Sequence, residues 1–594
     1  MLKFSKLPTY IFAVLIFFTA NVCAGAAELD RSRYIGIDEI TPGMKAYCLT
    51  VFKGTQIERF DFEVLSVVRN IEPKRNAIMV RGIDERFIHA GMVAGCSGSP
   101  VYIDGRLAGA LAFGWSFSKD PLYGVTPIEE MLAVGTAGDG GHARQPVIDL
   151  SGSIDLQRIE KQYISSLHRQ SQMRSSSNAL AMPVMISGIP DSAVGEFENL
   201  FGPVTAAGPS GSVQAGEDVE LSPGGVLTVP LITGDIDISV LGTVTEVDGE
   251  NVYAFGHSFL GYGPVELPMA TGQVHTIVAN LMRSFKLGSP GEIVGTLFAD
   301  ETSAVRGRIG TVPPMIPMTI NVSRFNTPQP VTYQCSIAND DYLTPILVRI
   351  ALAGAANQRG ELPPEHTLRY RTTIEIEGEE SISFENVSVN SRVAELLTET
   401  MVPVALIMNN PYRQGEIKSI RCDMEELDRA MLADIKSVEI YDNKVEQGER
   451  FSVEAVIEPM RSQKKKYTFD FTVPKDLKPG EYDVFVLGGA EYLEFLISAA
   501  KQRFIAENYE TLISALNNIL SVRRDRLYCV FMLPESGVTL ERAELPDLPM
   551  TQVLVLTDST RTTDAQPYRH WIEKSVRTPQ VIRGAGQMKI EVVR

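Results

Sequence analysis

Residues 91–100 read Gly-Met-Val-Ala-Gly-Cys-Ser-Gly-Ser-Pro, and the interpretation of the chain depends on this stretch. Small residues surround the hydroxyl of Ser97, which lets the backbone turn tightly at this position. The residues that follow, 101–112, alternate in the manner of a strand pair with Asp104-Gly105 between the strands. An Asp-Gly pair in this setting is a typical β-hairpin signal. The stretch therefore predicts a tight turn that presents one serine and leads directly into a strand.

The same turn offers a place for negative charge. The N–H groups of Gly95 and Ser97 can point to one spot if Gly95 and Gly98 take backbone angles that are closed to other residues. Two converging N–H groups form the oxyanion hole that acyl transfer needs. A glycine-rich entry to a hairpin, with Ser97 only a turn residue, is the alternative interpretation.

A nucleophilic serine needs a base, and the chain has seven histidines. Only His257 has a distinctive context, because an apolar strand leads into Gly256-His257 and then into a glycine-rich loop. We expect the imidazole at a strand end that faces a cleft, and a buried structural histidine is the alternative. A third group would orient the imidazole. The conceivable carboxylates, among which the sequence does not choose, are Asp84, Asp104, Asp235, Asp237 and Glu266.

Together these motifs resemble the sporulation stage-IV-B serine peptidase family. The resemblance rests on residues 95–105, on Tyr-Gly-Val-Thr-Pro-Ile-Glu-Glu-Met-Leu at 123–132 and on Phe-Gly-His at 255–257, and it covers about 34–134 and 225–310. It implies a trypsin-like double β-barrel with the site between the barrels. It also implies Ser97 as nucleophile, His257 as general base and Asp84, thirteen residues before the serine, as the third catalytic residue.

Three features depart from the family pattern. Cys96 stands where the family usually has methionine, which makes its thiol an alternative nucleophile. The serine motif precedes the histidine motif, whereas sporulation members have the opposite order. Geometry and not chain order defines a catalytic triad, so the reversed order implies permuted barrels. No PDZ-like module precedes the serine motif, so the sporulation-signalling role is not carried over.

The N-terminus predicts export. Two lysines precede an apolar run at residues 10–20, and small residues follow at 24–27, which is the layout of a signal peptide over residues 1–26. An uncleaved anchor and a lipid on Cys23 are the alternatives. We expect an exported chain, periplasmic or extracellular. The net charge of −18 argues against a nucleic-acid partner.

Cysteine usage predicts neither a disulfide framework nor a metal site. The six cysteines are widely spaced and form no Cys-x-x-Cys pair. We expect those of the mature chain to be buried apolar side chains. No cofactor and no metal are expected.

A chain of 594 residues is too long for one core. Strand-like text punctuated by glycine predicts a mainly β protein. The peptidase region would be followed by β-sandwich-like accessory domains. The predicted divisions are a signal peptide at 1–26, a barrel with the serine motif at 34–134, a linker at 135–178, a barrel with the histidine motif at 179–324, a β accessory domain at 325–435, an immunoglobulin-like domain at 436–490 and an α/β segment at 491–594.

The favoured function is an exported serine endopeptidase that cleaves a protein or peptide substrate in the cell envelope. The C-terminal β domains would recruit that substrate or an envelope protein partner, and the linker at 135–178 is a candidate site of self-processing. The alternatives are a catalytically silent scaffold that keeps the peptidase fold and an adhesive or carbohydrate-binding β protein. The distance from Ser97 Oγ to His257 Nε2 discriminates the first two, because catalysis needs hydrogen-bond reach.

Overall fold

A computed structural model describes most of the chain and shows a mainly β protein. The described residues are 29–115, 118–136, 148–174, 179–190, 204–206, 219–358, 360, 362–391, 393–540, 543–558 and 565–594. The predicted signal peptide at 1–26 and Cys23 lie outside these ranges. Among the described residues, no helix has both the length and the apolar character of a membrane span.

The N-terminal part is a closed six-stranded barrel. Its strands are, in order around the ring, β1 (Lys45–Val51), β2 (Ile57–Glu72), β3 (Arg75–Gly82), β7 (Leu122–Pro127), β6 (Arg106–Gly114) and β5 (Pro100–Ile103). Asp104 and Gly105 both have positive φ at the β5–β6 turn, as a two-residue hairpin of this twist requires. Phe60, Phe87 and Tyr123 are fully buried inside the ring and meet edge to face.

Short elements complete this barrel. They are η1 (Ile37–Glu39), α1 (Glu85–Ala90), β4 (Val93–Ala94) and α2 (Ile128–Leu132). Strand β4 leaves the barrel and pairs in parallel with β14 of the next part of the chain. The Ser97 turn, which begins directly after β4, therefore lies where the two parts meet.

A second ring of six strands follows. These strands are β10 (Val226–Gly234), β13 (Gly263–Val278), β14 (Ser284–Glu301), β15 (Ala304–Ile309), β12 (Asn251–Ala254) and β11 (Asp237–Asp248). The ring closes because β10 pairs with β11 as well as with β13. The predicted fold class, mainly β with a double barrel, is confirmed.

The sheet does not stop at the predicted boundary between residues 324 and 325. Strand β17 (Val331–Ala338) pairs with β10, and β16 (Met315–Arg324) pairs with β17. The sheet then continues through β20 (Ile417–Leu427), β18 (Thr367–Ile376) and β19 (Ile382–Val389), and β8 (Val184–Ser187) and β9 (Val204–Ala206) extend its other end. The predicted accessory domain at 325–435 is thus a continuation of the second ring's sheet.

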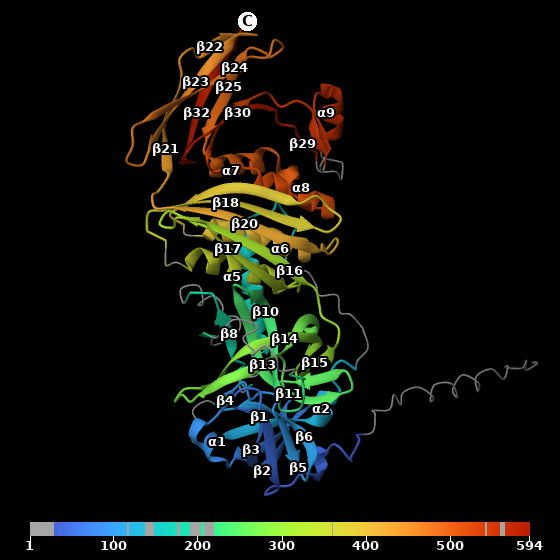
Figure 1. The fold of residues 1–594 in the computed structure, drawn as a ribbon. Helices are drawn as coiled ribbons and strands as arrows, with labels where there is room; N and C mark the ends of the chain where they lie inside the picture. The colour runs from blue at the N-terminus through green and yellow to red at the C-terminus, as the bar shows by residue number, and fades with distance from the viewer. Residues whose placement is uncertain are drawn as a thin grey trace, which may run out of the picture.

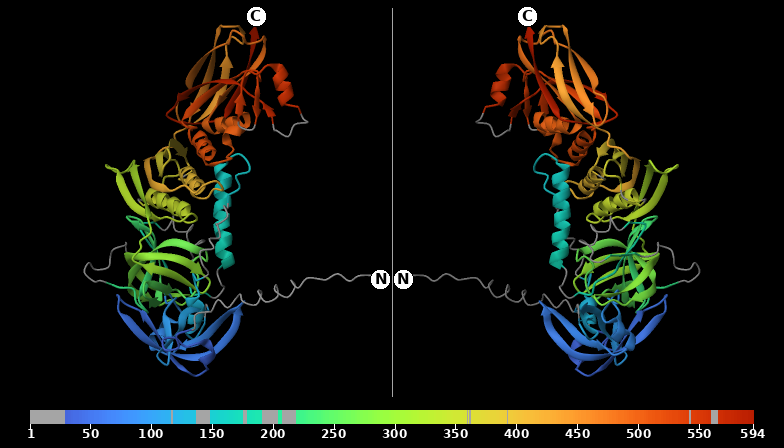
Figure 2. Two further views of the ribbon diagram at one scale, coloured as in Figure 1. Left: turned by 90° about the vertical axis from the view of Figure 1, so that its right-hand side faces the viewer. Right: turned by 90° about the vertical axis from the view of Figure 1, so that its left-hand side faces the viewer.

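Three helices pack against this sheet and its core. They are α3 (Leu156–Arg174), α5 (Thr344–Asn357) and α6 (Ala394–Met408). Helix α3 belongs to the stretch predicted as a linker, yet Ile159, Tyr163 and Leu167 are buried in the largest core cluster. Their spacing of four residues gives one apolar face, so this half of the predicted linker is a packed helix. Figure 2 shows α3 running lengthwise along the molecule.

The C-terminal part has two sheets around one core. One sheet has the order β24-β23-β21-β31 and the other β22-β32-β25-β26-β30. The strands are β21 (Leu432–Ile440), β22 (Lys444–Glu446), β23 (Arg450–Pro459), β24 (Lys465–Thr472), β25 (Gly480–Leu487), β26 (Arg526–Met532), β30 (Trp571–Arg577), β31 (Val581–Arg583) and β32 (Ala585–Val593). Because β25 pairs with β26 and β32, the predicted segments 436–490 and 491–594 form one sandwich-like unit.

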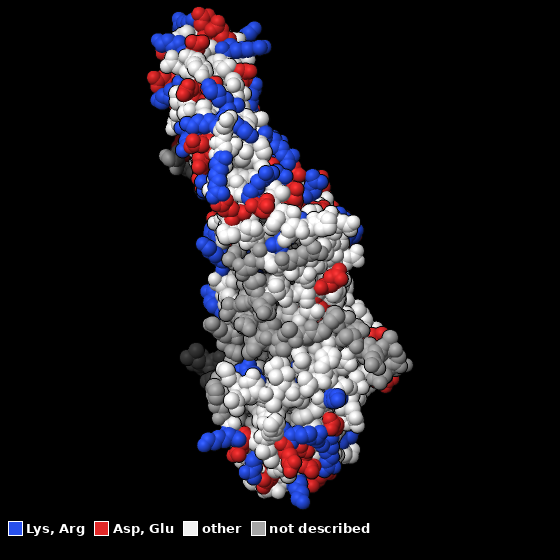
Figure 3. Space-filling model, turned by 60° about the vertical axis from the view of Figure 1, so that its left-hand side comes forward, with Lys and Arg blue, Asp and Glu red and all other residues white. Residues whose placement is uncertain are grey.

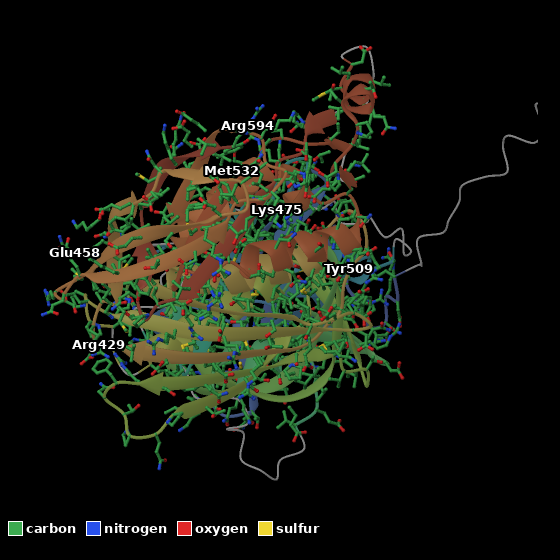
Figure 4. The ribbon with its side chains drawn as sticks, turned by 90° about the horizontal axis from the view of Figure 1, so that it is seen from above. Arg429, Glu458, Lys475, Tyr509, Met532 and Arg594 are labelled. Atoms are coloured by element: carbon green, nitrogen blue, oxygen red, sulfur yellow. The ribbon has the colours of Figure 1, made fainter. Side chains whose placement is uncertain are left out.

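The remaining elements of this part are α7 (Gly489–Ala499), η2 (Lys501–Phe504), α8 (Tyr509–Leu520), β27 (Val538–Leu540), β28 (Ala543–Leu545), α9 (Met550–Leu556) and β29 (Ala565–Pro567). Helices α7 and α8 lie between the sandwich and the yellow sheet strands below it (Figure 1). Figure 4 views this part from above, with Glu458 toward one side and Tyr509 toward the other.

The molecule is elongated, with the N-terminal barrel at one end and the C-terminal part at the other (Figure 1). On the face drawn in Figure 3, charged side chains gather toward the two ends of the molecule. The described residues between these ends are mostly uncharged and are drawn in white. The contact between the two rings lies in the half of the molecule away from the C-terminal part.

Candidate active site

The Ser97 turn connects β4 to β5 and depends on two glycines. Gly95 and Gly98 have φ of 89° and 91°, values that side-chain-bearing residues rarely adopt. A Cβ on Gly98 would lie 2.0 Å from the carbonyl oxygen of Thr243. Gly98 is therefore required both for its backbone angle and for the close approach of β11.

Backbone hydrogen bonds attach the turn to the first barrel. The N–H of Gly98 donates to the carbonyl of Leu111 at 2.8 Å, and the N–H of Leu111 donates to the carbonyl of Ser99 at 3.0 Å. Leu111 belongs to β6, so the hairpin predicted from the sequence holds the serine turn against its own second strand.

Strand β11 attaches the turn to the second ring. The N–H of Thr243 donates to the carbonyl of Ser97 at 2.9 Å, and its hydroxyl donates to the carbonyl of Gly95, also at 2.9 Å. The hydroxyl of Thr245 donates to the carbonyl of Gly98 at 2.7 Å. The carbonyls of Gly95, Ser97 and Gly98 thus each accept a hydrogen bond from β11, and these bonds fix the turn between the two rings.

His257 follows β12 in a strained backbone. Phe255 and Gly256 have φ of 70° and 69°, and a positive φ at a bulky residue is a genuine outlier. The Phe255 ring packs directly against Gly242. A Cβ on Gly242 would lie 2.4 Å from the ring, so only glycine leaves room for it. The hydroxyl of Thr126, on β7 of the first barrel, donates to the carbonyl of Gly256 at 2.6 Å.

The structure brings Ser97 and His257 together. Ser97 Oγ lies 2.5 Å from His257 Nε2, and His257 Nδ1 lies 2.8 Å from the carbonyl oxygen of Ser258. A carbonyl only accepts, so Nδ1 carries the proton and Nε2 is free to accept the proton of the serine hydroxyl. The carbonyl of Phe255, 2.7 Å from Ser97 Oγ, is a second acceptor for that proton.

Burial keeps the imidazole neutral. It lowers the pKa of His257 to about 4, against a smaller opposing effect of the Ser258 carbonyl, which favours the charged form. A neutral imidazole at neutral pH is the form that a general base needs.

The N–H groups expected to form the oxyanion hole are available. Within the described part of the chain, the N–H of Gly95 and the N–H of Ser97 donate no hydrogen bond, whereas the turn's own bonds use those of Cys96, Gly98 and Ser99. The structure thus leaves free the two donors on which the sequence interpretation relied.

Asp84 does not contact the imidazole. It is the N-cap of α1, where its carboxylate accepts from the N–H of Arg86 at 2.9 Å and from the Arg86 guanidinium. These charge-assisted bonds, opposing the effect of burial, lower the pKa of Asp84. The partner of His257 Nδ1 is instead a backbone carbonyl, so the orienting role expected of Asp84 has no contact to support it. Asp104, Asp235 and Glu266 are exposed.

Asp300, which the sequence interpretation missed, holds the loop that follows His257. Its buried carboxylate accepts from the N–H groups of Phe259, Leu260 and Gly261 at 2.7, 2.6 and 2.6 Å. Burial raises the pKa of Asp300 to about 6, and the N–H donors oppose that rise. No sequence motif links a carboxylate at the end of β14 to a loop some forty residues earlier.

Cys96 points away from the dyad. Its thiol is fully buried in the first barrel's core, and burial raises its pKa, which disfavours the reactive thiolate. Cys48, Cys96, Cys335, Cys422 and Cys529 are all buried free thiols. Over the described ranges, no group of three or more His, Cys, Asp or Glu side chains could hold a metal.

Residues 180–183 lie across the same site. The N–H of Leu180 donates to the carbonyl of Ala112 at 2.8 Å, and the carbonyl of Pro183 accepts from the N–H of Leu241 at 3.1 Å. Pro183 Cγ is 3.2 Å from the position that a Cβ on Gly95 would take. Ser97 has no exposed surface and His257 is 5% exposed.

Two β-barrels with a serine–histidine pair at their contact are the arrangement of trypsin-like serine peptidases. Comparison with family models places residues 22–132 in a match to SpoIVB peptidase S55. This match confirms the resemblance for the first barrel and the Ser97 turn and supports a serine peptidase, while His257 lies outside the matched residues. Searches of the curated proteins and of the solved structures found no match to the chain.

Proposed function

We propose that the protein is an exported serine endopeptidase that cleaves a protein substrate through an acyl-enzyme. Ser97 Oγ attacks the scissile carbonyl while His257 Nε2 takes the hydroxyl proton. His257 then returns that proton to the leaving amine, and water hydrolyses the ester on Ser97 in the second half of the reaction. The N–H groups of Gly95 and Ser97 stabilise the oxyanion in both halves.

The observation that carries the proposal is the 2.5 Å separation of Ser97 Oγ and His257 Nε2. It is well within the reach that proton transfer needs. The Nδ1–H donation to the Ser258 carbonyl supports it further, because it fixes the tautomer whose Nε2 accepts. In this proposal a backbone carbonyl takes the orienting role that a carboxylate has in a triad.

Export and an envelope substrate rest on the sequence. The lysines, apolar run and small residues of 1–26 support a periplasmic or extracellular location. The C-terminal sandwich-like part, at the far end of the molecule from the N-terminal barrel (Figure 1), is a suitable place to recruit a protein substrate or an envelope partner.

The complete burial of Ser97 favours one second candidate, a scaffold that keeps the fold without the activity. For the peptidase, substrate entry requires the residues around the dyad to move, and these include residues 180–183, which contact both the turn and β6. A silent scaffold needs no such movement.

One experiment separates the two functions. The purified protein is treated with a fluorophosphonate probe, which reacts with activated serines, and hydrolysis of an unfolded fluorescent protein is measured in parallel. We expect labelling and hydrolysis by the wild type, and loss of both in Ser97→Ala and His257→Ala. Ser151→Ala, an exposed serine outside the site, is the matched control. An unlabelled wild type with no hydrolysis supports the scaffold and refutes the peptidase.

A further inference from the structure

A buried lysine lies beneath the Ser97 turn. Lys286, on β14, has no exposed surface. Its Nζ donates to the hydroxyl of Thr50 on β1 at 2.8 Å and to the hydroxyl of Thr243 on β11 at 3.1 Å. The amine therefore bridges the two rings. Within the part of the chain that the structure describes, no carboxylate forms an ion pair with it.

Both hydroxyls that accept from Lys286 also bind the turn. Thr243 donates to the carbonyl of Gly95, and Thr50 accepts from the hydroxyl of Ser99 at 2.9 Å. Through these two hydroxyls, the lysine is connected by hydrogen bonds to Gly95 and Ser99, which stand on either side of Ser97. Its stem runs directly under this segment, because Lys286 Cβ is 3.2 Å from the position of a Cβ on Gly95.

A lysine here is costly for stability. Taking an amine out of water without an anionic partner is unfavourable, and burial lowers the pKa of Lys286. The titratable groups that face it are the thiols of Cys96 in the turn and Cys48 on β1. Burial raises the pKa of both thiols, which disfavours a thiolate partner. Methionine would fill a similar space without this cost, so packing alone does not explain the residue.

Negative charge does develop at this place in the proposed reaction. The oxyanion would bind at the N–H groups of Gly95 and Ser97, in the turn that Thr243 and Thr50 connect to the lysine. We propose that Lys286 is a positioning residue of the peptidase site, which holds the turn through Thr50 and Thr243 so that the N–H groups of Gly95 and Ser97 are in place for the oxyanion, without touching the substrate. This inference rests on the proposed peptidase function.

The test is Lys286→Met with the fluorophosphonate probe, read as the maximal labelling rate and the half-saturating probe concentration. We expect the maximal rate to fall about 100-fold and the half-saturating concentration to stay within about twofold of the wild type. The melting temperature should be unchanged or higher, because the variant removes a buried amine without an anionic partner. A merely structural lysine predicts the reverse, a lower melting temperature with an unchanged maximal rate.

Controls separate this inference from the proposed function. Lys45→Met, an exposed lysine on β1, should label like the wild type, and Ser97→Ala should not label. If Lys286→Met does not fold, Thr50→Val should slow labelling and Thr50→Ser should restore it. A wild type that does not label overturns the peptidase function and this inference with it. A labelled wild type matched in maximal rate by Lys286→Met, or by Thr50→Val where the lysine variant does not fold, overturns the inference alone.

Discussion

Gly98 has closer neighbours than Gly105, the hairpin glycine that also has a positive φ. A side chain there meets the backbone of Thr243 and Phe255, and backbone does not yield as a flexible side chain does. Ser97 can therefore lie close to β11 and to His257 because its neighbour Gly98 has no Cβ.

We predict that Gly98→Ala lowers the unfolding free energy by about 3 kcal/mol or more and abolishes probe labelling. Gly105→Ala is the matched control, since Gly105 also has a positive φ, 77°, but no atom within 4 Å of its added Cβ. That control should lose about 1 kcal/mol and keep full labelling. Urea unfolding and probe labelling of both variants check this. Equal losses in the two variants would contradict the role given to close approach.

At the scale of elements, the loop after β12 connects the imidazole to β14. Asp300 gathers the N–H groups of residues 259–261, so the direction of His257 depends on a carboxylate in a different strand. An amide in its place has one nitrogen that cannot accept, so at least one of these bonds is lost.

We predict that Asp300→Asn lowers the labelling rate about 10- to 100-fold by misplacing His257. Glu301→Gln, an exposed carboxylate on the same strand, should label normally. Normal labelling of Asp300→Asn would show that the loop does not position the imidazole.

The same variant changes the dependence of stability on pH. The pKa of Asp300 is raised by folding to about 6, so its stabilising contribution is complete at low pH and is lost as the pH rises through about 6. His257 acts with the opposite sign, because its pKa is lowered to about 4 and its contribution is lost as the pH falls from about 6.5 toward 4. We expect the stability difference between Asp300→Asn and Glu301→Gln to vary with pH between 4 and 6.

Local patterns predicted much of the fold at this scale. Three elements depend mainly on neighbours in sequence, and their residues therefore predict them: the Asp104-Gly105 hairpin, the turn at Ser97 and the strand before His257. The continuation of the sheet from β10 to β17 and the pairing of β25 with β32 are long-range. Alternating apolar residues give a strand's faces but not its partners, so the sequence could not predict the pairings that cross residues 324 and 490.

The candidate site divides in the same way. Ser97 and His257 stand in glycine-rich contexts that the sequence displays, and the structure brings them into contact. The sequence around Asp300, Lys286 and Thr243 is that of an ordinary strand and contains no motif. Only the packing of the two rings places these residues near the dyad. The family resemblance implies Asp84 as the third catalytic residue, but an Asp directly before a short helix is also a typical N-cap.

At the scale of the whole molecule, a buried ionic network joins the C-terminal part to the central sheet. The Arg524 guanidinium donates to Glu399 of α6 at 2.6 Å and to the carbonyl of Val387 at 2.8 Å. Tyr370 of β18 also donates to Glu399, at 2.6 Å. When one member of such a hydrogen-bonded ionic network is removed, the protein is strongly destabilised, because the remaining charge loses its partner.

We predict that Arg524→Met lowers the unfolding free energy by about 3 kcal/mol and that adding Glu399→Met restores most of the loss. The control is Arg461→Met, which removes an exposed pair with Glu365 and should cost less than about 1 kcal/mol. Urea unfolding measures stability, and probe labelling of Ser97 should be the same in all three. Altered labelling would mean that the C-terminal part is coupled to the dyad.

The separation of the dyad over two rings has a consequence for the chain while it is being synthesised. Ser97 leaves the ribosome 160 residues before His257, and Lys286 and Asp300 follow later still. A growing chain therefore holds the nucleophile without its base until β12 and the loop that follows it are made. Under the proposed function, the long separation of the two motifs along the chain keeps an unfinished peptidase from cutting the proteins that handle it.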